Sequence, residues 1–152
     1  MQSTNPVVLA HAEHKFVYSI HDYPNLGVNN EGPSTADRNA AWGFLAMTRI
    51  APVWIGEMGA SLDAPHEDGV TPAQQAAWAR QLVAYINGKA AGGPTFTSNQ
   101  QPFGSDWWAW GSLDGQTPNG TMQGDTLRPA QLAIYAQLRF TKRISEHKQE
   151  PK

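Results

Sequence analysis

Short apolar runs alternate with longer amphipathic segments along this chain. The apolar runs are residues 16–20, 52–55 and 107–110. Each run is followed by glycine, proline or polar residues, a pattern that indicates buried strands. The amphipathic segments are residues 36–47, 72–87 and 129–140. Their apolar side chains recur at helical spacing, so the chain is predicted to form three consecutive strand–loop–helix units.

The clearest helix boundary in the sequence is at residue 71. Thr71 can cap a helix, Pro72 suits its first turn, and Gln74 completes a capping box. Strands that alternate with helices predict a parallel sheet with right-handed crossovers. We therefore expect one α/β domain over residues 1–140, followed by a charged tail over residues 141–152.

Composition narrows the choice of partner. Only 16% of the residues are charged and the formal net charge is −2, which argues against nucleic acid or an anionic membrane. No apolar run approaches the ~18 residues needed to span a bilayer, and the N-terminus has no export-signal pattern. Six tryptophans are many for 152 residues. Because aromatic faces stack on sugar rings, they favour a carbohydrate partner, with core or interface packing as the alternative role.

Polar and aromatic residues follow all three predicted strands. The strand ends read His21-Asp22-Tyr23, Glu57-Met58-Gly59 and Trp110-Gly111-Ser112. The carboxyl ends of parallel strands meet at one edge of a sheet, and chemistry in α/β folds is found there. The sequence therefore predicts a site at this edge.

Glu57 is the strongest candidate for chemistry at that edge. A carboxylate between glycines after an apolar strand is costly to bury unless it is paired or hydrogen-bonded. In a pocket it could attack the anomeric carbon of a sugar; the alternative is a structural carboxylate that binds backbone amides or an arginine. His21 and Tyr23 are two residues apart, so their side chains can leave the strand on one face. The tyrosine hydroxyl could orient Glu57 and the histidine could bind a sugar hydroxyl, unless both only pack.

The tryptophan cluster offers a surface for a sugar ring. In a regular strand Trp107 points away from Trp108, whereas Trp108 and Trp110 share a face. Trp110, at the predicted strand end, is the candidate platform for the reacting sugar, with Trp108 on the same side. The histidines lack the helical pairing typical of zinc ligands and cysteine is absent, so neither a metal nor a cofactor is predicted.

The three strand-end motifs resemble the C-terminal part of glycoside hydrolase family 5, which includes many bacterial endoglucanases (cellulases). The matching segments are residues 17–24 for the sixth-strand motif, 52–59 for the nucleophile motif and 107–111 for the eighth-strand motif. Met58 and Gly111 stand where the family usually has phenylalanine and asparagine. The resemblance extends over about residues 5–140 and keeps the family's order and spacing.

This resemblance implies a hydrolase of β-glucans or β-glucosides with a retaining mechanism. By resemblance Glu57 is the nucleophile, His21 and Tyr23 are its site partners, and Trp110 is the sugar platform. The family fold is an eight-stranded barrel of usually ~250 residues or more, so three units imply a partial, half-barrel-like (β/α)8 fold. The family's general acid/base belongs to an Asn-Glu-Pro segment, which this sequence lacks. A retaining site needs two carboxyls about 5 Å apart, and only the first is identified.

Three sources of the second carboxyl stay open. They are Glu67 or Asp68 in the loop after the second strand, Asp22 or Asp114 beside the neighbouring strands, and a second copy of the chain. A partial barrel also leaves two strand edges and one sheet face uncovered, so we expect a homo-oligomer. The first functional hypothesis is an active glycosidase for small β-linked substrates; the second is a non-catalytic carbohydrate-binding remnant.

Overall fold

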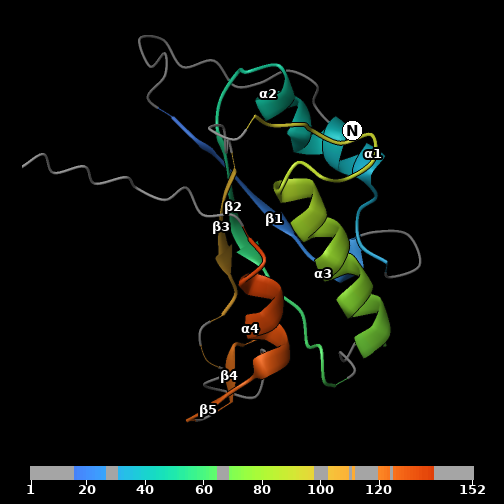
Figure 1. The fold of residues 1–152 in the computed structure, drawn as a ribbon, viewed down its shortest axis with the longest axis vertical. Helices are drawn as coiled ribbons and strands as arrows, with labels where there is room; N and C mark the ends of the chain where they lie inside the picture. Colours follow the sequence, from blue (N-terminus) through green and yellow to red (C-terminus); the bar gives the residue numbers. More distant parts are fainter. Residues whose placement is uncertain are drawn as a thin grey trace, which may run out of the picture.

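The structure, a computed structural model, describes residues 16–26, 31–64, 69–97, 103–109, 111, 120–123 and 125–138. It is a mixed α/β fold built on a three-stranded parallel sheet (Figure 1). The strands are β1 (Tyr18–Asp22), β2 (Val53–Met58) and β3 (Phe103–Trp107), and they lie side by side in that order. The predicted α/β fold with a parallel sheet is therefore confirmed.

The first predicted helix forms as one helical segment with a wider turn in its middle. α1 (Thr35–Arg38) and α2 (Phe44–Met47) are joined by a π-helical turn, Asn39–Gly43. A Cβ atom on Gly43 would overlap the hydroxyl of Tyr85. Glycine at this position therefore lets the next helix approach the segment closely.

The second predicted helix has the start that the sequence indicates. α3 (Pro72–Ile86) begins with a capping box in which Thr71 Oγ1 accepts from the Gln74 amide and Gln74 Oε1 accepts from the Thr71 amide. Each bond satisfies a backbone donor that has no partner within the helix. Trp78 and Tyr85 are fully buried on the sheet side of α3, which runs along the sheet in Figure 1.

The third strand lies earlier in the chain than its apolar run predicted. We expected residues 107–110, whereas β3 covers Phe103–Trp107. Its buried positions alternate with Gly104 and Asp106, which conceal the apolar signal of the strand. A Cβ atom on Gly104 would overlap the indole of Trp54 from β2. The predicted bounds were wrong because they followed the run of aromatic residues at 107–110. The strand itself has polar residues or glycine on its other face and so shows no apolar run.

The first two strands continue past the apolar runs that predicted them. β1 ends at Asp22 and β2 ends at Met58. His21 and Glu57 therefore lie within strands and take part in the parallel pairing. Polar residues near the end of a half-buried strand escape an apolar-run criterion, which explains the difference.

The last part of the chain holds a small hairpin and a short helix. β4 (Met122–Gln123) pairs antiparallel with β5 (Thr126–Leu127) inside the predicted loop. Strands of two residues are too short to show an alternating pattern. α4 (Pro129–Tyr135) begins as predicted and ends before the predicted boundary at residue 140. The charged tail lies outside the described residues.

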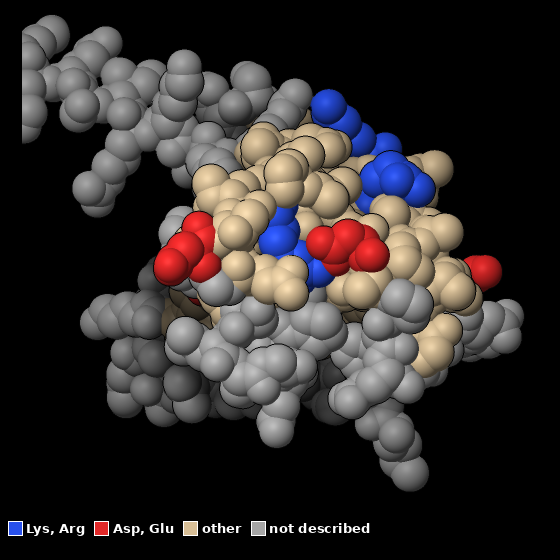
Figure 2. Space-filling view, turned by 90° about the horizontal axis from the view of Figure 1, so that it is seen from below, with Lys and Arg blue, Asp and Glu red and all other residues tan. Residues whose placement is uncertain are grey.

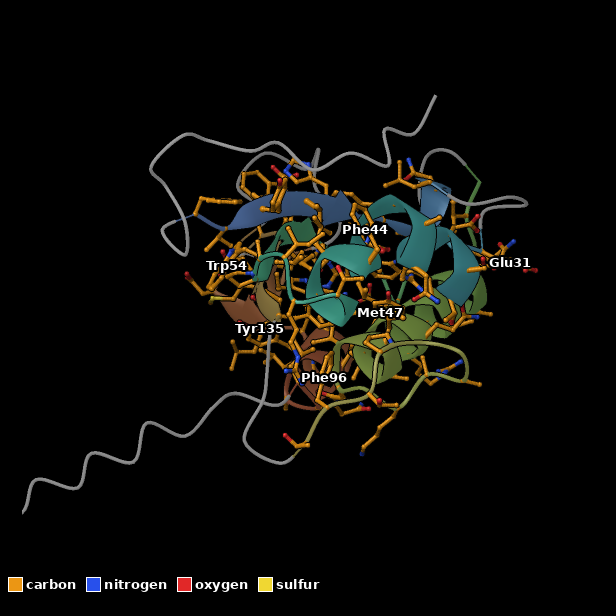
Figure 3. The ribbon with its side chains drawn as sticks, turned by 90° about the horizontal axis from the view of Figure 1, so that it is seen from above. Glu31, Phe44, Met47, Trp54, Phe96 and Tyr135 are labelled. Atoms are coloured by element: carbon orange, nitrogen blue, oxygen red, sulfur yellow. The ribbon has the colours of Figure 1, made fainter. Side chains whose placement is uncertain are left out.

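Among the described residues, the helices cover one face of the sheet and leave the other, open face without a helix. The core contains sheet residues such as Val53 and Ile55 together with helix residues such as Trp78. On the opposite face, Trp54 is 42% exposed, and its indole Nε1 donates to the Asp106 carboxylate at 2.8 Å. Figure 3 shows Trp54 on the side of the sheet turned away from α3. Among the described helices, none is long and apolar enough to cross a bilayer.

Candidate active site

A register shift in the sheet brings Glu57 to the same face as His21. The partners of β1 on β2 move from Ile55 to Glu57 between Ile20 and His21, so one extra residue is inserted in β2. Ile55 and Met58 are both buried on the helix-covered side, with two residues between them instead of one. Such a bulge redirects the side chain that follows it. Without it, strict alternation would turn Glu57 toward the core.

His21 and Tyr23 both contact one oxygen of Glu57. The Tyr23 hydroxyl donates to Glu57 Oε2 at 3.0 Å, and His21 Nδ1 lies 3.3 Å from the same atom. The side chains of His21 and Glu57 are 55% and 30% exposed, so the carboxylate is reachable from solvent. Within the described residues no hydrogen bond to Oε1 is found.

Tyr23 is held in its protonated form. Burial raises the pKa of the Tyr23 phenol well above its ordinary value, and the hydrogen bond to Glu57 and the charge of that carboxylate raise it further. A phenol with a raised pKa keeps its proton at neutral pH and can only donate toward a carboxylate. Tyr23 is therefore a permanent donor that fixes one oxygen of Glu57.

Trp108 projects into solvent directly after β3. Its backbone amide donates to the carbonyl of Met58 at 2.7 Å, so it continues the pairing with the strand that carries Glu57. Trp108 is 46% exposed. Trp107 instead packs edge-on against Tyr135 of α4, with ring centroids 6.5 Å apart. Trp107 thus packs against a helix, whereas Trp108 is exposed. Trp110, the predicted platform, lies outside the described residues.

Asp22 is not available as the second carboxyl. Its side chain is fully buried, where Arg38 donates through Nε and Nη2 at 2.8 and 3.1 Å and Trp78 Nε1 donates at 2.8 Å. Asp22 points to the helix-covered side of the sheet, away from Glu57, because β1 side chains alternate. The proposal of Asp22 as an acid is therefore corrected.

The remaining carboxyl candidates and the wider surroundings are described only in part. Glu67, Asp68 and Asp114 lie outside the described residues. In the described part of the chain, no group of three or more His, Asp or Glu residues could hold a metal ion.

One face of the molecule, seen from below the view of Figure 1, carries acidic and basic side chains side by side (Figure 2). Charge on this face therefore does not form one block of a single sign.

One contact near this edge had no signal in the sequence. Arg128, just before α4, binds Asp63 and Ser61 in the loop that follows β2. An arginine before a helix gives no indication of a partner far away in sequence.

A search against known family models found no match to this chain. The chemistry available at the edge is thus an oriented, partly exposed carboxylate with a neutral donor, an imidazole and an aromatic face.

Proposed function

We propose that this chain is a glycoside hydrolase of β-linked glucosides or glucans, with Glu57 as the nucleophile of a retaining reaction. The observation that supports this most is the contact of Tyr23 and His21 with a single oxygen of Glu57. A carboxylate fixed through Oε2 presents Oε1 in a constant direction, as nucleophilic attack requires. Release of a phenol from an aryl β-cellobioside tests the proposal.

The reaction would proceed in two displacements. A Glu57 oxygen forms a bond to the anomeric carbon, while the bond from that carbon to the leaving oxygen breaks and its electron pair leaves with the aglycone. An aryl oxide needs no proton to leave, so the first step can run on activated substrates without a general acid. Water then attacks the same carbon, releases the Glu57 carboxylate, and loses its proton to solvent.

Trp108 would bind the sugar next to Glu57. Its backbone amide continues the pairing of β3 with β2 at Met58, the residue after the nucleophile, and the residue is exposed. Aromatic rings of this kind offer an apolar face on which the C–H side of a glucose ring can stack. Trp110, two residues later, would extend the platform.

Replacing Tyr23 with phenylalanine is expected to lower kcat on an aryl β-cellobioside by roughly ten- to a hundredfold, since one preorganised donor is lost. Glu57 Oε2 would retain only the contact with His21, and the carboxylate would sample unproductive orientations. The profile of rate against pH should keep its shape below about pH 10, because Tyr23 does not ionise there in the parent.

The measurement is steady-state kinetics of both proteins across the neutral and mildly alkaline range. Tyr18→Phe, on the strand that leads to Tyr23, is the matched control and should leave kcat within about twofold, because its ring packs against the core rather than Glu57. Equal kcat values for the parent and Tyr23→Phe would contradict the role of Tyr23.

The fold would be part of a (β/α)8 barrel that a second copy completes or covers. Supporting features are the parallel order of β1, β2 and β3 and the open sheet face. On that face Trp54 is exposed, yet its indole N–H already has an acceptor in Asp106. Burial of the ring in an interface would therefore not leave this N–H without a hydrogen-bond acceptor. A second copy is also one of the possible sources of the missing carboxyl.

The chain is therefore expected to associate with itself at micromolar concentration. Light scattering coupled to size-exclusion chromatography should give a mass of at least a dimer. Trp54→Glu should shift the mass toward the monomer, because it places a charge on the open face, whereas Arg80→Glu on the exposed side of α3 should not. A clean monomer mass for the parent chain would contradict the expectation.

The second candidate function is a carbohydrate-binding protein without catalysis. The exposed indole of Trp108 favours it, as does the burial of Asp22, which removes one possible acid. Absence of turnover on activated substrates, together with oligosaccharide binding that is lost in Trp108→Ala, would support this candidate over hydrolysis. Trp42→Phe is no substitute for that variant, because Trp42 is buried in the core.

A further inference from the structure

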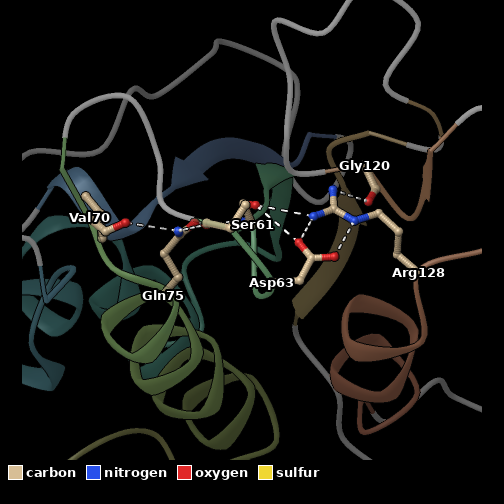
Figure 4. Close-up of polar contacts among 7 residues, drawn as sticks. Ser61, Asp63, Val70, Gln75, Gly120 and Arg128 are labelled. Atoms are coloured by element: carbon tan, nitrogen blue, oxygen red, sulfur yellow. Dashed lines mark hydrogen bonds and ion pairs between the residues drawn. The ribbon is translucent and has the colours of Figure 1, made fainter.

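Arg128 joins two segments that are far apart in the sequence. Its side chain is 9% exposed, and its guanidinium contacts both carboxylate oxygens of Asp63, the Ser61 hydroxyl at 3.2 Å and the Gly120 carbonyl at 3.3 Å (Figure 4). A nearly buried guanidinium with partners on two segments fixes their separation, since its donors form a rigid planar fork.

The first of the two segments follows the nucleophile strand. Ser61 and Asp63 lie a few residues after Glu57. The Ser61 amide donates to Gln75 Oε1 at 2.6 Å, and Gln75 Nε2 donates to the Val70 carbonyl at 3.2 Å (Figure 4). Gln75 is fully buried on α3. This segment is therefore anchored to α3 by contacts that do not involve Arg128.

The second segment supports Trp108. The Arg128 amide donates to the Thr121 carbonyl at 2.8 Å, and the Thr121 amide donates to the Ala109 carbonyl at 3.0 Å. Ala109 directly follows Trp108, whose own amide is bound to Met58 on β2. Thr121 is 3% exposed. Thr121 and Ala109 thus link the backbone of Arg128 to Trp108, and the Arg128 side chain binds the same segment at the neighbouring Gly120 carbonyl.

We propose that Arg128 is a positioning residue, which holds the segment carrying Trp108 against the anchored loop after Glu57 and so sets the width of the sugar site. This role rests on the proposed glycosidase function for its catalytic consequence, but the coupling of the two segments does not. The hydrogen bonds from Arg128 hold the pKa of Asp63 below its ordinary value, which agrees with a persistent ion pair.

The coupling predicts a selective loss of sugar binding. Arg128→Ala should raise KM for an aryl β-cellobioside by about tenfold or more, because the platform is displaced. kcat should change much less, since His21 and Tyr23 orient Glu57 without Arg128. Asp63→Asn keeps the shape of the side chain and should give a smaller change in the same direction, and Arg128→Lys should not restore the parent KM because it lacks the planar fork.

A structural readout tests the coupling independently of activity. In Arg128→Ala, amide hydrogen exchange at Trp108 and Thr121 should accelerate, while exchange at Ile20 and Ile55 in the sheet centre should not. Asn39→Ala is the control: it likewise removes side-chain hydrogen bonds that link distant segments, those with Tyr85 and Gly92, but touches neither segment. It should lower stability without changing KM or exchange at Trp108.

The outcomes separate the two ideas. Faster exchange at Trp108 and Thr121 with no turnover in the parent would support the coupling and count against the proposed function. Turnover in the parent with unchanged exchange and unchanged KM in Arg128→Ala would overturn the positioning role. If Arg128→Ala does not fold, the same comparison is made with Asp63→Asn, in which unchanged exchange and KM would overturn the role as well.

Discussion

Glu57→Gln is expected to lower kcat on an aryl β-cellobioside by at least about a thousandfold, as removal of a covalent nucleophile does. Glutamine keeps the size of the side chain and can still accept from Tyr23, so the site geometry should survive. The amide oxygen is a poor nucleophile, and no glycosyl ester can form. The measurement is phenol release under saturating substrate, with binding of cellobiose measured separately to show that the site is intact.

The control for this variant is Glu31→Gln, an exposed carboxylate away from β2, which should leave kcat within about twofold. A second control uses Glu57→Ala with added azide. The small anion can occupy the space of the lost carboxylate and should restore turnover as an α-glycosyl azide. Retention of most of the parent activity by Glu57→Gln would contradict the nucleophile role.

Asp22→Ala is expected to lower the free energy of unfolding by about 3–5 kcal/mol, since it leaves a buried charge without its partner. Arg38 and Trp78 both donate to Asp22, and all three side chains are fully buried. In the variant the buried Arg38 guanidinium would have no carboxylate beside it. Its Nη1 already lacks a hydrogen-bond partner among the described residues. Urea unfolding followed by far-UV circular dichroism measures the change.

The double variant Asp22→Ala/Arg38→Met provides the control. Because it removes the charge together with its partner, it should be more stable than Asp22→Ala alone. Asp22 also lies between His21 and Tyr23 in the chain, so the buried pair fixes the end of β1, on either side of which these two residues contact Glu57. A loss below about 1 kcal/mol in Asp22→Ala would show that water reaches the guanidinium and that this anchor is weak.

The sequence indicated the elements of the fold better than their ends. The start of α3 could be predicted because Thr71 and Gln74 form a local capping box that needs no distant partner. The place of β3 could not, because Gly104 is explained by the indole of Trp54 on another strand. Local patterns thus located the helices, whereas strand limits depended on neighbours that the sequence does not identify.

The candidate site divides in the same way. His21 and Tyr23 could be placed near Glu57 from their spacing and from the common edge of parallel strands. The bulge that turns Glu57 to that face could not be predicted, since it exists only in the pairing of β1 with β2. The burial of Asp22 was also missed, because its partner Arg38 is brought there by the tertiary fold.

The most direct test of the central claim is to trap the covalent intermediate. A 2-deoxy-2-fluoro β-cellobioside with a dinitrophenyl leaving group slows both displacements but still departs without acid assistance. Intact-mass spectrometry should show one added fluorocellobiosyl group per chain, and peptide mapping should place it on Glu57, with no label in Glu57→Gln. A chain that remains unlabelled after prolonged incubation, or that carries the label on another residue, would contradict the assignment of Glu57 as the nucleophile.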